Sequence, residues 1–180
     1  MKKFVKAICM TSILCVLLFF MASCSGYNFY DDFHKAGADI EKDHIFQIIT
    51  LEEAKQKKEN GDTFVLLYGS SSNTGCVNLV TKLQAQAEYL GNTDAVIYYL
   101  NSTEYNSSSK RSEVREAIKM HDPSKDGSPI VMIFTSAPSS SRVDVDTSFT
   151  DSSQTKKFME AGSIQYSSLA SYIFKEILIK

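Results

Sequence analysis

The sequence predicts an α/β domain whose mixed central sheet is flanked by helices. The first observation behind this prediction is that apolar runs typical of strands alternate with segments of helical periodicity. The second is that two of these runs, 63–68 and 95–100, are nearly continuous, as in strands covered on both faces. The third is that a strand at 130–135 is followed by another at 142–149 without a helix between them, which indicates a closing hairpin.

The first two elements are a strand and a helix with a clear start signal. The residues His44 to Thr50 predict a short strand, and Leu51 to Glu59 predict the helix that follows it. Thr50 is expected to cap this helix, because Glu53 stands three residues later and completes a capping box. Asn60-Gly61 is expected to end the helix.

The next pair is a central strand and a long helix. Thr63 to Tyr68 predicts the strand, and a Gly and Ser loop, Gly69 to Ser72, leads out of it. A helix is expected from Thr74 to Leu90, and Gly91-Asn92 ends it. Its apolar positions recur at spacings of three and four: Val77, Val80, Leu83, Ala87 and Leu90.

The rest of the chain completes an order of β-α-β-α-β-α-β-β-α. The polar, Ser-rich segment Asn101 to Lys110 is expected to be a solvated loop. The remaining expected elements are the strand Ala95 to Leu100, the helix Ser112 to Met120, the strand Ile130 to Thr135 that Pro129 opens, the edge strand Arg142 to Phe149, and the helix Ser167 to Leu178.

The N-terminus has the pattern of an export signal. Basic residues precede an apolar run, Ala7 to Met21, that is shorter than the roughly 20 residues a membrane-spanning helix needs. Met21-Ala22-Ser23-Cys24 resembles the lipobox of bacterial lipoproteins, and this implies cleavage after residue 23 and a diacylglycerol on Cys24. The alternatives are a plain secretory signal cleaved nearby and an uncleaved single-span anchor. We therefore expect a signal peptide at 1–23, a lipidated tether at 24–42 and one domain at 43–180.

This processing changes the meaning of the cysteines. Cys9 and Cys15 would leave with the signal peptide and Cys24 would be a thioether, so Cys76 is the remaining thiol. A mature domain with one thiol has no internal disulfide, and its stability must come from packing.

Charge and composition exclude some partners. The chain has 19 Lys and Arg against 21 Asp and Glu, which provides no basic surface for nucleic acid. His34, His44 and His121 have no metal-ligand spacing, so neither a metal nor another cofactor is expected.

Two further motifs connect the chain to a known family. One is Phe64-Val-Leu-Leu-Tyr-Gly-Ser-Ser-Ser-Asn-Thr-Gly-Cys76, at a junction between strand and helix, and the other is Asp126-Gly-Ser-Pro129-Ile-Val-Met-Ile-Phe134. With these motifs and its order of elements, the chain resembles the thioredoxin superfamily, and in particular its bacteriocin-transport accessory type. The resemblance implies a thioredoxin-like fold, places Asn73, Thr74, Gly75 and Cys76 where the family has C-x-x-C, and implies a cis peptide bond before Pro129.

The departure from the family is at Asn73, which stands in place of the attacking cysteine. Dithiol chemistry is thereby excluded, and three interpretations of Cys76 stay open: a buried packing residue, an exposed monothiol, or a link between two chains. The leading hypothesis is a lipid-anchored protein on the extracytoplasmic face of the cell membrane that binds an exported protein or peptide. The alternatives are a monothiol oxidoreductase acting through Cys76 and a purely structural lipoprotein.

Overall fold

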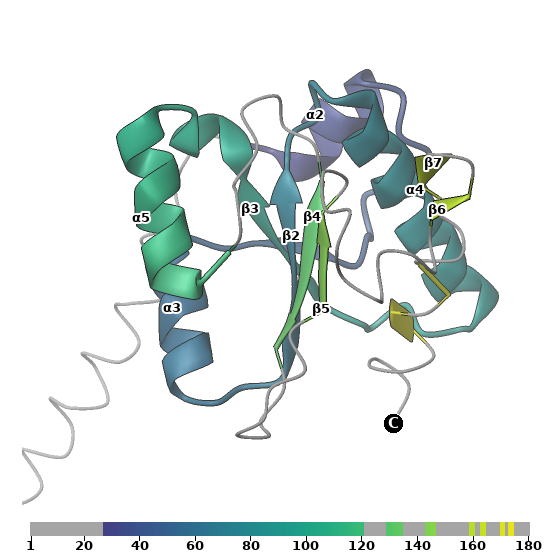
Figure 1. The fold of residues 1–180 in the computed structure, drawn as a ribbon. Helices are drawn as coiled ribbons and strands as arrows, with labels where there is room; N and C mark the ends of the chain where they lie inside the picture. Colours follow the sequence, from purple (N-terminus) through teal and green to yellow (C-terminus); the bar gives the residue numbers. More distant parts are fainter. Residues whose placement is uncertain are drawn as a thin grey trace, which may run out of the picture.

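The described part of the protein contains a five-stranded mixed sheet with helices on both faces (Figure 1). The computed structural model describes residues 27–120, 129–134, 143–146, 159–160, 163–164, 170–171 and 173–174. The strand order is β1-β3-β2-β4-β5. The sheet confirms the predicted class, an α/β fold with a mixed sheet between helices. Its strands are β1 (Phe46–Ile48), β2 (Phe64–Gly69), β3 (Ile97–Asn101), β4 (Ile130–Phe134) and β5 (Val143–Asp146).

The strand directions follow from the connections. β1, β2 and β3 are mutually parallel, because a helix connects each of them to the next along the chain. β4 is antiparallel to β2, and β5 is antiparallel to β4. β5 therefore lies at the edge of the sheet, as the alternating pattern of 142–149 predicted.

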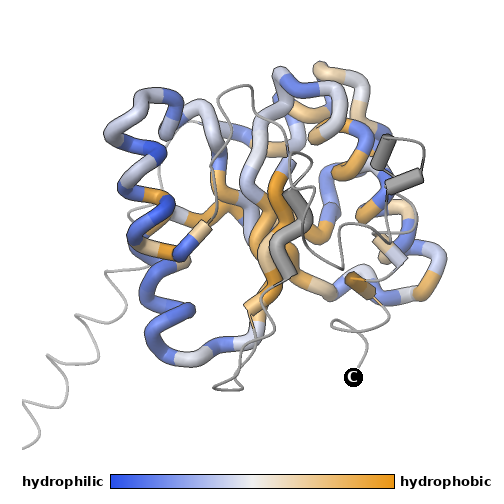
Figure 2. The backbone as a smooth tube through the Cα atoms, in the orientation of Figure 1, coloured by the Kyte–Doolittle hydropathy of each residue, from blue (hydrophilic) through white to orange (hydrophobic). Residues whose placement is uncertain are grey.

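Two separate apolar layers hold the helices to the sheet. α3 (Leu51–Glu59) and α5 (Ser108–Ile118) pack on one face, and α2 (Phe29–Lys35) and α4 (Thr74–Tyr89) pack on the other. Alternate residues of β2 serve the two layers: Leu66 belongs to the first and Leu67 to the second. The hydrophobic strands in the middle and the hydrophilic outer sides of α3 and α5 show the same layering (Figure 2).

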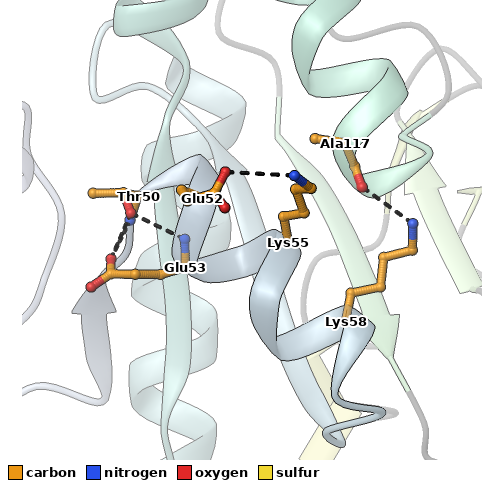
Figure 3. A network of polar contacts seen from close by, with 6 residues as sticks. All are labelled: Thr50, Glu52, Glu53, Lys55, Lys58 and Ala117. Atoms are coloured by element: carbon orange, nitrogen blue, oxygen red, sulfur yellow. Dashed lines mark hydrogen bonds and ion pairs between the residues drawn. The ribbon is translucent and has the colours of Figure 1, made fainter. Parts of the chain in front are cut away.

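The start of α3 has the predicted capping box. The Thr50 hydroxyl accepts from the Glu53 N–H at 3.2 Å, and a Glu53 carboxylate oxygen accepts from the Thr50 N–H at 2.8 Å. Lys58, near the other end of α3, donates to the main-chain oxygen of Ala117 in α5 at 3.2 Å. The polar contacts therefore fix both the start of α3 and its position beside α5 (Figure 3).

The segment 101–110 differs from the predicted loop. Ser102–Tyr105 is a 3-10 helix, and α5 begins at Ser108, four residues before the predicted start at Ser112. The cause is local, because the Ser107 hydroxyl accepts from the Lys110 N–H at 3.3 Å and caps the helix. Several serines in this segment could each cap the helix, so the sequence alone does not show at which of them the helix starts.

The segment expected to be a tether is in large part folded. Asn28 caps α2, and the buried rings of Phe29 and Phe33 stack on each other with their centroids 4.4 Å apart. Phe29 also packs against Phe46 of β1 and Tyr99 of β3, with ring centroids 4.8 Å apart in both cases. The folded domain therefore includes residues 27–42 as well, whereas the sequence predicts a domain that begins at residue 43.

The last part of the chain adds two features. β6 (Met159–Glu160) and β7 (Ser163–Ile164) form an antiparallel pair that was not predicted. Within the helix predicted from Ser167 to Leu178, the described residues Ala170, Ser171 and Ile173 are helical. The buried Ala170, Ile173 and Phe174 belong to the same apolar layer as α2 and α4. The other residues of that predicted helix lie outside the described part of the chain.

Candidate functional site

The candidate site lies where β2 leads into α4, at the carboxyl ends of the parallel strands. Ligands of open α/β sheets commonly bind at such an edge. The connection is braced by Ser70, whose side chain is almost fully buried. Its hydroxyl accepts from the Ser72 N–H and its main-chain oxygen from the Asn73 N–H, each at 3.1 Å. The loop that the sequence left without regular structure thus has a defined conformation.

Asn73 is the N-cap residue of α4. Its side-chain oxygen accepts from the main-chain N–H of Cys76 at 3.2 Å. A helix N-terminus stabilises negative charge, and in the resembled family that is the setting of the reactive thiolate. In this chain the position holds a neutral carboxamide that is neither a nucleophile nor redox-active. It caps the helix instead.

Cys76 lies beneath this loop, inside the core. Its side chain has no exposed surface and belongs to the apolar layer beneath α4. Loss of solvation by burial raises the pKa of the Cys76 thiol to about 12, although a backbone hydrogen bond with Ser70 lowers it in part. The protonated form therefore dominates at physiological pH. Of the three interpretations from the sequence, this geometry favours the packing residue.

A group of polar residues behind the loop was not predicted from the sequence. The Tyr99 hydroxyl of β3 donates to the main-chain oxygen of Gly69 at 2.8 Å. It also accepts from the Tyr27 hydroxyl at 3.4 Å, and the two rings stack with their centroids 6.0 Å apart. Burial is the main cause that raises the pKa of Tyr27 to about 12 and the pKa of Tyr99 still further. Both phenols are therefore neutral donors that tie the N-terminal segment to the end of β2.

The sequence held only a weak signal for this group. Tyr99 lies inside an apolar run that predicts a buried strand, and a buried tyrosine hydroxyl generally needs a partner. Nothing in the pattern identified the partner as Gly69. That contact depends on the pairing of β2 with β3, which is a long-range feature.

Pro129 is buried immediately before β4. The antiparallel register pairs Ile130 with Tyr68, so the next positions along the two strands, Pro129 and Gly69, are neighbours. Pro129 therefore lies opposite Gly69, where the loop that ends at Asn73 begins. The predicted cis bond involves Ser128, which lies outside the described residues, and it stays a prediction.

Tyr68 contrasts with Tyr99 on the adjacent strand. Its side chain is fully buried in the layer under α3 and α5, and its hydroxyl has no hydrogen-bond partner among the described residues. Burial raises the pKa of Tyr68 to about 12 despite the charge of Arg111, which lowers it. An unpaired buried hydroxyl is destabilising, and it is uncommon in folded proteins.

The histidines do not assemble into a site where they are described. His34 is exposed on α2 and its ring stacks on that of Tyr30. The half-buried His44 accepts from the Phe46 N–H through Nδ1 at 3.3 Å. His121 lies outside the described residues. In the described ranges no three His, Cys, Asp or Glu side chains are grouped so that they could hold a metal ion.

Comparison with models of known protein families and with curated proteins gives no match to this chain. None of the helices in the described ranges combines the length and the apolar character needed to cross a membrane. The case for a function therefore depends on the site itself.

Proposed function

We propose that this chain is a lipid-anchored, extracytoplasmic thioredoxin-like protein that lacks the dithiol. It binds an exported protein or peptide and does not catalyse a reaction on it. One observation carries the proposal: the junction of β2 and α4 has Asn73 as a helix cap, and the thiol three residues later, Cys76, is fully buried. Such a site can offer hydrogen bonds, but its thiol is inaccessible to a reactant.

The strand order supports the thioredoxin-like part of the proposal. Three parallel strands in the order β1-β3-β2 continue into the antiparallel strands β4 and β5, with helices on both faces. Asn73 stands at the start of the helix after the central strand, and Pro129, immediately before β4, lies opposite Gly69 at the end of that strand. These are the positions that the family resemblance assigns to its C-x-x-C and its proline.

The exposed part of the same edge supports a binding role. Ser72 and Thr74 flank Asn73 and are exposed, while Ser70 beneath them is buried and fixes the loop. Such a preformed loop loses little conformational freedom on binding, which favours affinity. A rigid rim of small polar residues suits the main chain of an extended peptide.

No observation favours the alternative of a monothiol oxidoreductase. A reactive thiol of that kind needs exposure and a lowered pKa. Cys76 has no exposed surface, and its pKa is raised.

The anchoring part rests on the sequence Met21-Ala22-Ser23-Cys24. It is tested by growing cells with a clickable palmitate analogue and comparing the natural chain with a Cys24→Ser variant. The expected result is a labelled, membrane-associated protein only when Cys24 is present. Equal labelling of the two chains would contradict lipidation at this residue.

The binding part is tested by photo-crosslinking in the cells that make the protein. A benzophenone amino acid is placed at Ser72 or, as a matched exposed control, at Glu59 at the other end of the sheet. We expect a discrete adduct with one exported protein or peptide from Ser72, none from Glu59, and an unchanged adduct when Cys76→Ser is added. Absence of an adduct at Ser72, or the same adducts at both sites, would argue against a partner at this edge.

A further inference from the structure

A shallow groove runs along β1, at the edge of the sheet opposite β5. It has a volume of about 530 Å³. The buried ring of Phe46 contributes to its lining, and the exposed side chains of Asn28 and Gln47 line it as well. Tyr27 also lines it, at the point where the described chain begins. The groove is therefore next to the segment that would connect the domain to its lipid.

The chain is held firmly from Tyr27 onward. The Tyr27 ring stacks on Tyr99 and its hydroxyl donates to the Tyr99 hydroxyl. The next residue, Asn28, accepts from the Asp31 N–H at 3.2 Å and caps α2. The N-terminal segment thus enters the domain at a fixed place beside β1, and it is not a free tether there.

Very little chain lies between that place and the proposed lipid. Only Ser25 and Gly26 separate Cys24 from Tyr27. Even when fully extended, three residue steps span at most about 11 Å. The headgroup layer on one side of a bilayer is about 5–7 Å thick. A diacylglyceryl group on Cys24 therefore keeps Tyr27 within a few ångströms of the headgroups.

We infer that the groove along β1 faces the phospholipid headgroups of the membrane that holds the anchor. The inference rests on the proposed lipidation of Cys24. It assigns the membrane surface to a face of the domain that is separate from the loop at Asn73.

The charges near the groove indicate that the covalent lipid is what holds this face to the membrane. Asp31 and Asp32 lie in the first turn of α2, and the exposed Asp43 precedes His44. Lys35 in the last turn of α2 and the exposed Lys42 oppose these charges, so this segment has no cationic excess that would attract anionic headgroups. A domain without the lipid is accordingly expected not to bind vesicles of anionic phospholipid.

The orientation also bears on the candidate site. Tyr27 contacts Tyr99, and Tyr99 donates to Gly69 at the start of the loop that ends in Asn73. The side chain of Tyr99 thus links the loop to Tyr27, which is the described residue nearest the anchor in sequence. A partner that binds the loop ending in Asn73 would therefore bind close to the membrane surface.

The test measures how near two exposed positions come to the bilayer in the full, lipidated protein. A fluorophore is attached to a new thiol in Gln47→Cys, inside the groove, or in Glu59→Cys, at the far end of α3. In Figure 1, α2 and the connection from α3 to β2 lie at opposite ends of the sheet. Cys76 is fully buried, so the probe reacts with the new thiol. Each protein is reconstituted in phosphatidylcholine vesicles that contain a lipid with a nitroxide on its headgroup.

We expect the nitroxide to quench the fluorophore at Gln47 several-fold more strongly than the one at Glu59. A Gly/Ser insert of about 20 residues between Gly26 and Tyr27 would separate its ends by roughly 25 Å on average, and it should abolish the difference. Equal quenching without the insert, in a protein shown by mass to carry lipid on Cys24, would overturn the orientation and leave the anchor standing. Absence of lipid on Cys24 would overturn both.

Discussion

The side-chain oxygen of Asn73 accepts a hydrogen bond from the main-chain N–H of Cys76 at 3.2 Å. The two residues stand at the first turn of α4, one at its rim and the other inside the core. They are also three positions apart, the separation at which side chains at a helix start can meet. Because the two residues are this close, the arrangement can be tested by introducing a second cysteine at position 73.

We predict that Asn73→Cys forms an internal disulfide with Cys76 under mild oxidation. A bridge at this spacing lies within reach, because a disulfide needs the two Cα atoms about 4.4–6.8 Å apart. The measurement is a mass change of two hydrogens together with thiol counting. Thr74→Cys is the matched control, since residues two positions apart on a helix do not face each other. Failure of Asn73→Cys to close the bridge would count against the thioredoxin-like arrangement.

Removal of the cap should weaken the fold without affecting the core. We predict that Asn73→Ala lowers the free energy of unfolding by about 0.5–2 kcal/mol, measured by urea denaturation. Asn73→Asp should retain most of the stability, because it keeps the acceptor oxygen and places a negative charge at a helix N-terminus. Equal stability of the Ala variant and the natural chain would show that the bond to Cys76 contributes nothing.

The two buried tyrosines of neighbouring strands should respond in opposite ways to loss of the hydroxyl. Tyr99→Phe leaves the Gly69 oxygen without its donor and should cost about 1–3 kcal/mol of unfolding free energy. Tyr68→Phe removes a hydroxyl that has no partner among the described residues, so it should be neutral or stabilising. Urea denaturation of both variants decides the matter, and a larger loss for Tyr68→Phe would contradict the assigned bonds.

Local rules predicted much of the fold. The cap at Thr50 and its partner Glu53 act within one turn of chain, and the predicted bounds of α3 were confirmed. The fully buried β2 could be predicted from its apolar run, because a strand covered on both faces needs apolar residues at every position.

α2 was missed although local signals for it exist. Asn28 is a good cap, Phe29 and Phe33 are four residues apart, and Gly37 has the positive φ of 96° typical beyond a helix end. A helix this short has little intrinsic stability, and it depends on contacts with β1 and β3 that are distant in sequence.

The candidate site could be located from the sequence but not understood. The motif placed Asn73 and Cys76 at the start of a helix, where either an exposed or a buried thiol was possible. Whether the Cys76 thiol is exposed or buried depends on how α4 is rotated about its axis relative to the sheet. Tertiary packing alone determines that rotation. The contact from Tyr99 to Gly69 likewise needed the register of β2 with β3.

The lowered pKa of His44 predicts that the folded protein loses stability in mild acid. Burial disfavours the charged imidazolium and lowers the pKa of His44 below its usual 6.5. The unfolded chain then binds the proton more readily than the folded one. The stabilisation is therefore present above pH 6.5 and decreases as the pH falls from there to the lowered pKa of the folded state. Urea midpoints measured across this range should decline in the natural chain and less so in His44→Gln, and parallel profiles would show that His44 is not the cause.

The central claim, a binding edge without a reactive thiol, is tested most directly by the rate at which Cys76 is alkylated in the folded domain. The rate is measured across pH and compared with the rate in denaturant, where the thiol is accessible. The fully buried side chain and the raised pKa predict strong protection in the folded state at every pH up to the alkaline range. Rapid alkylation of the folded protein at mildly acidic pH would contradict the claim, because it would show an exposed thiolate at the position assigned to packing.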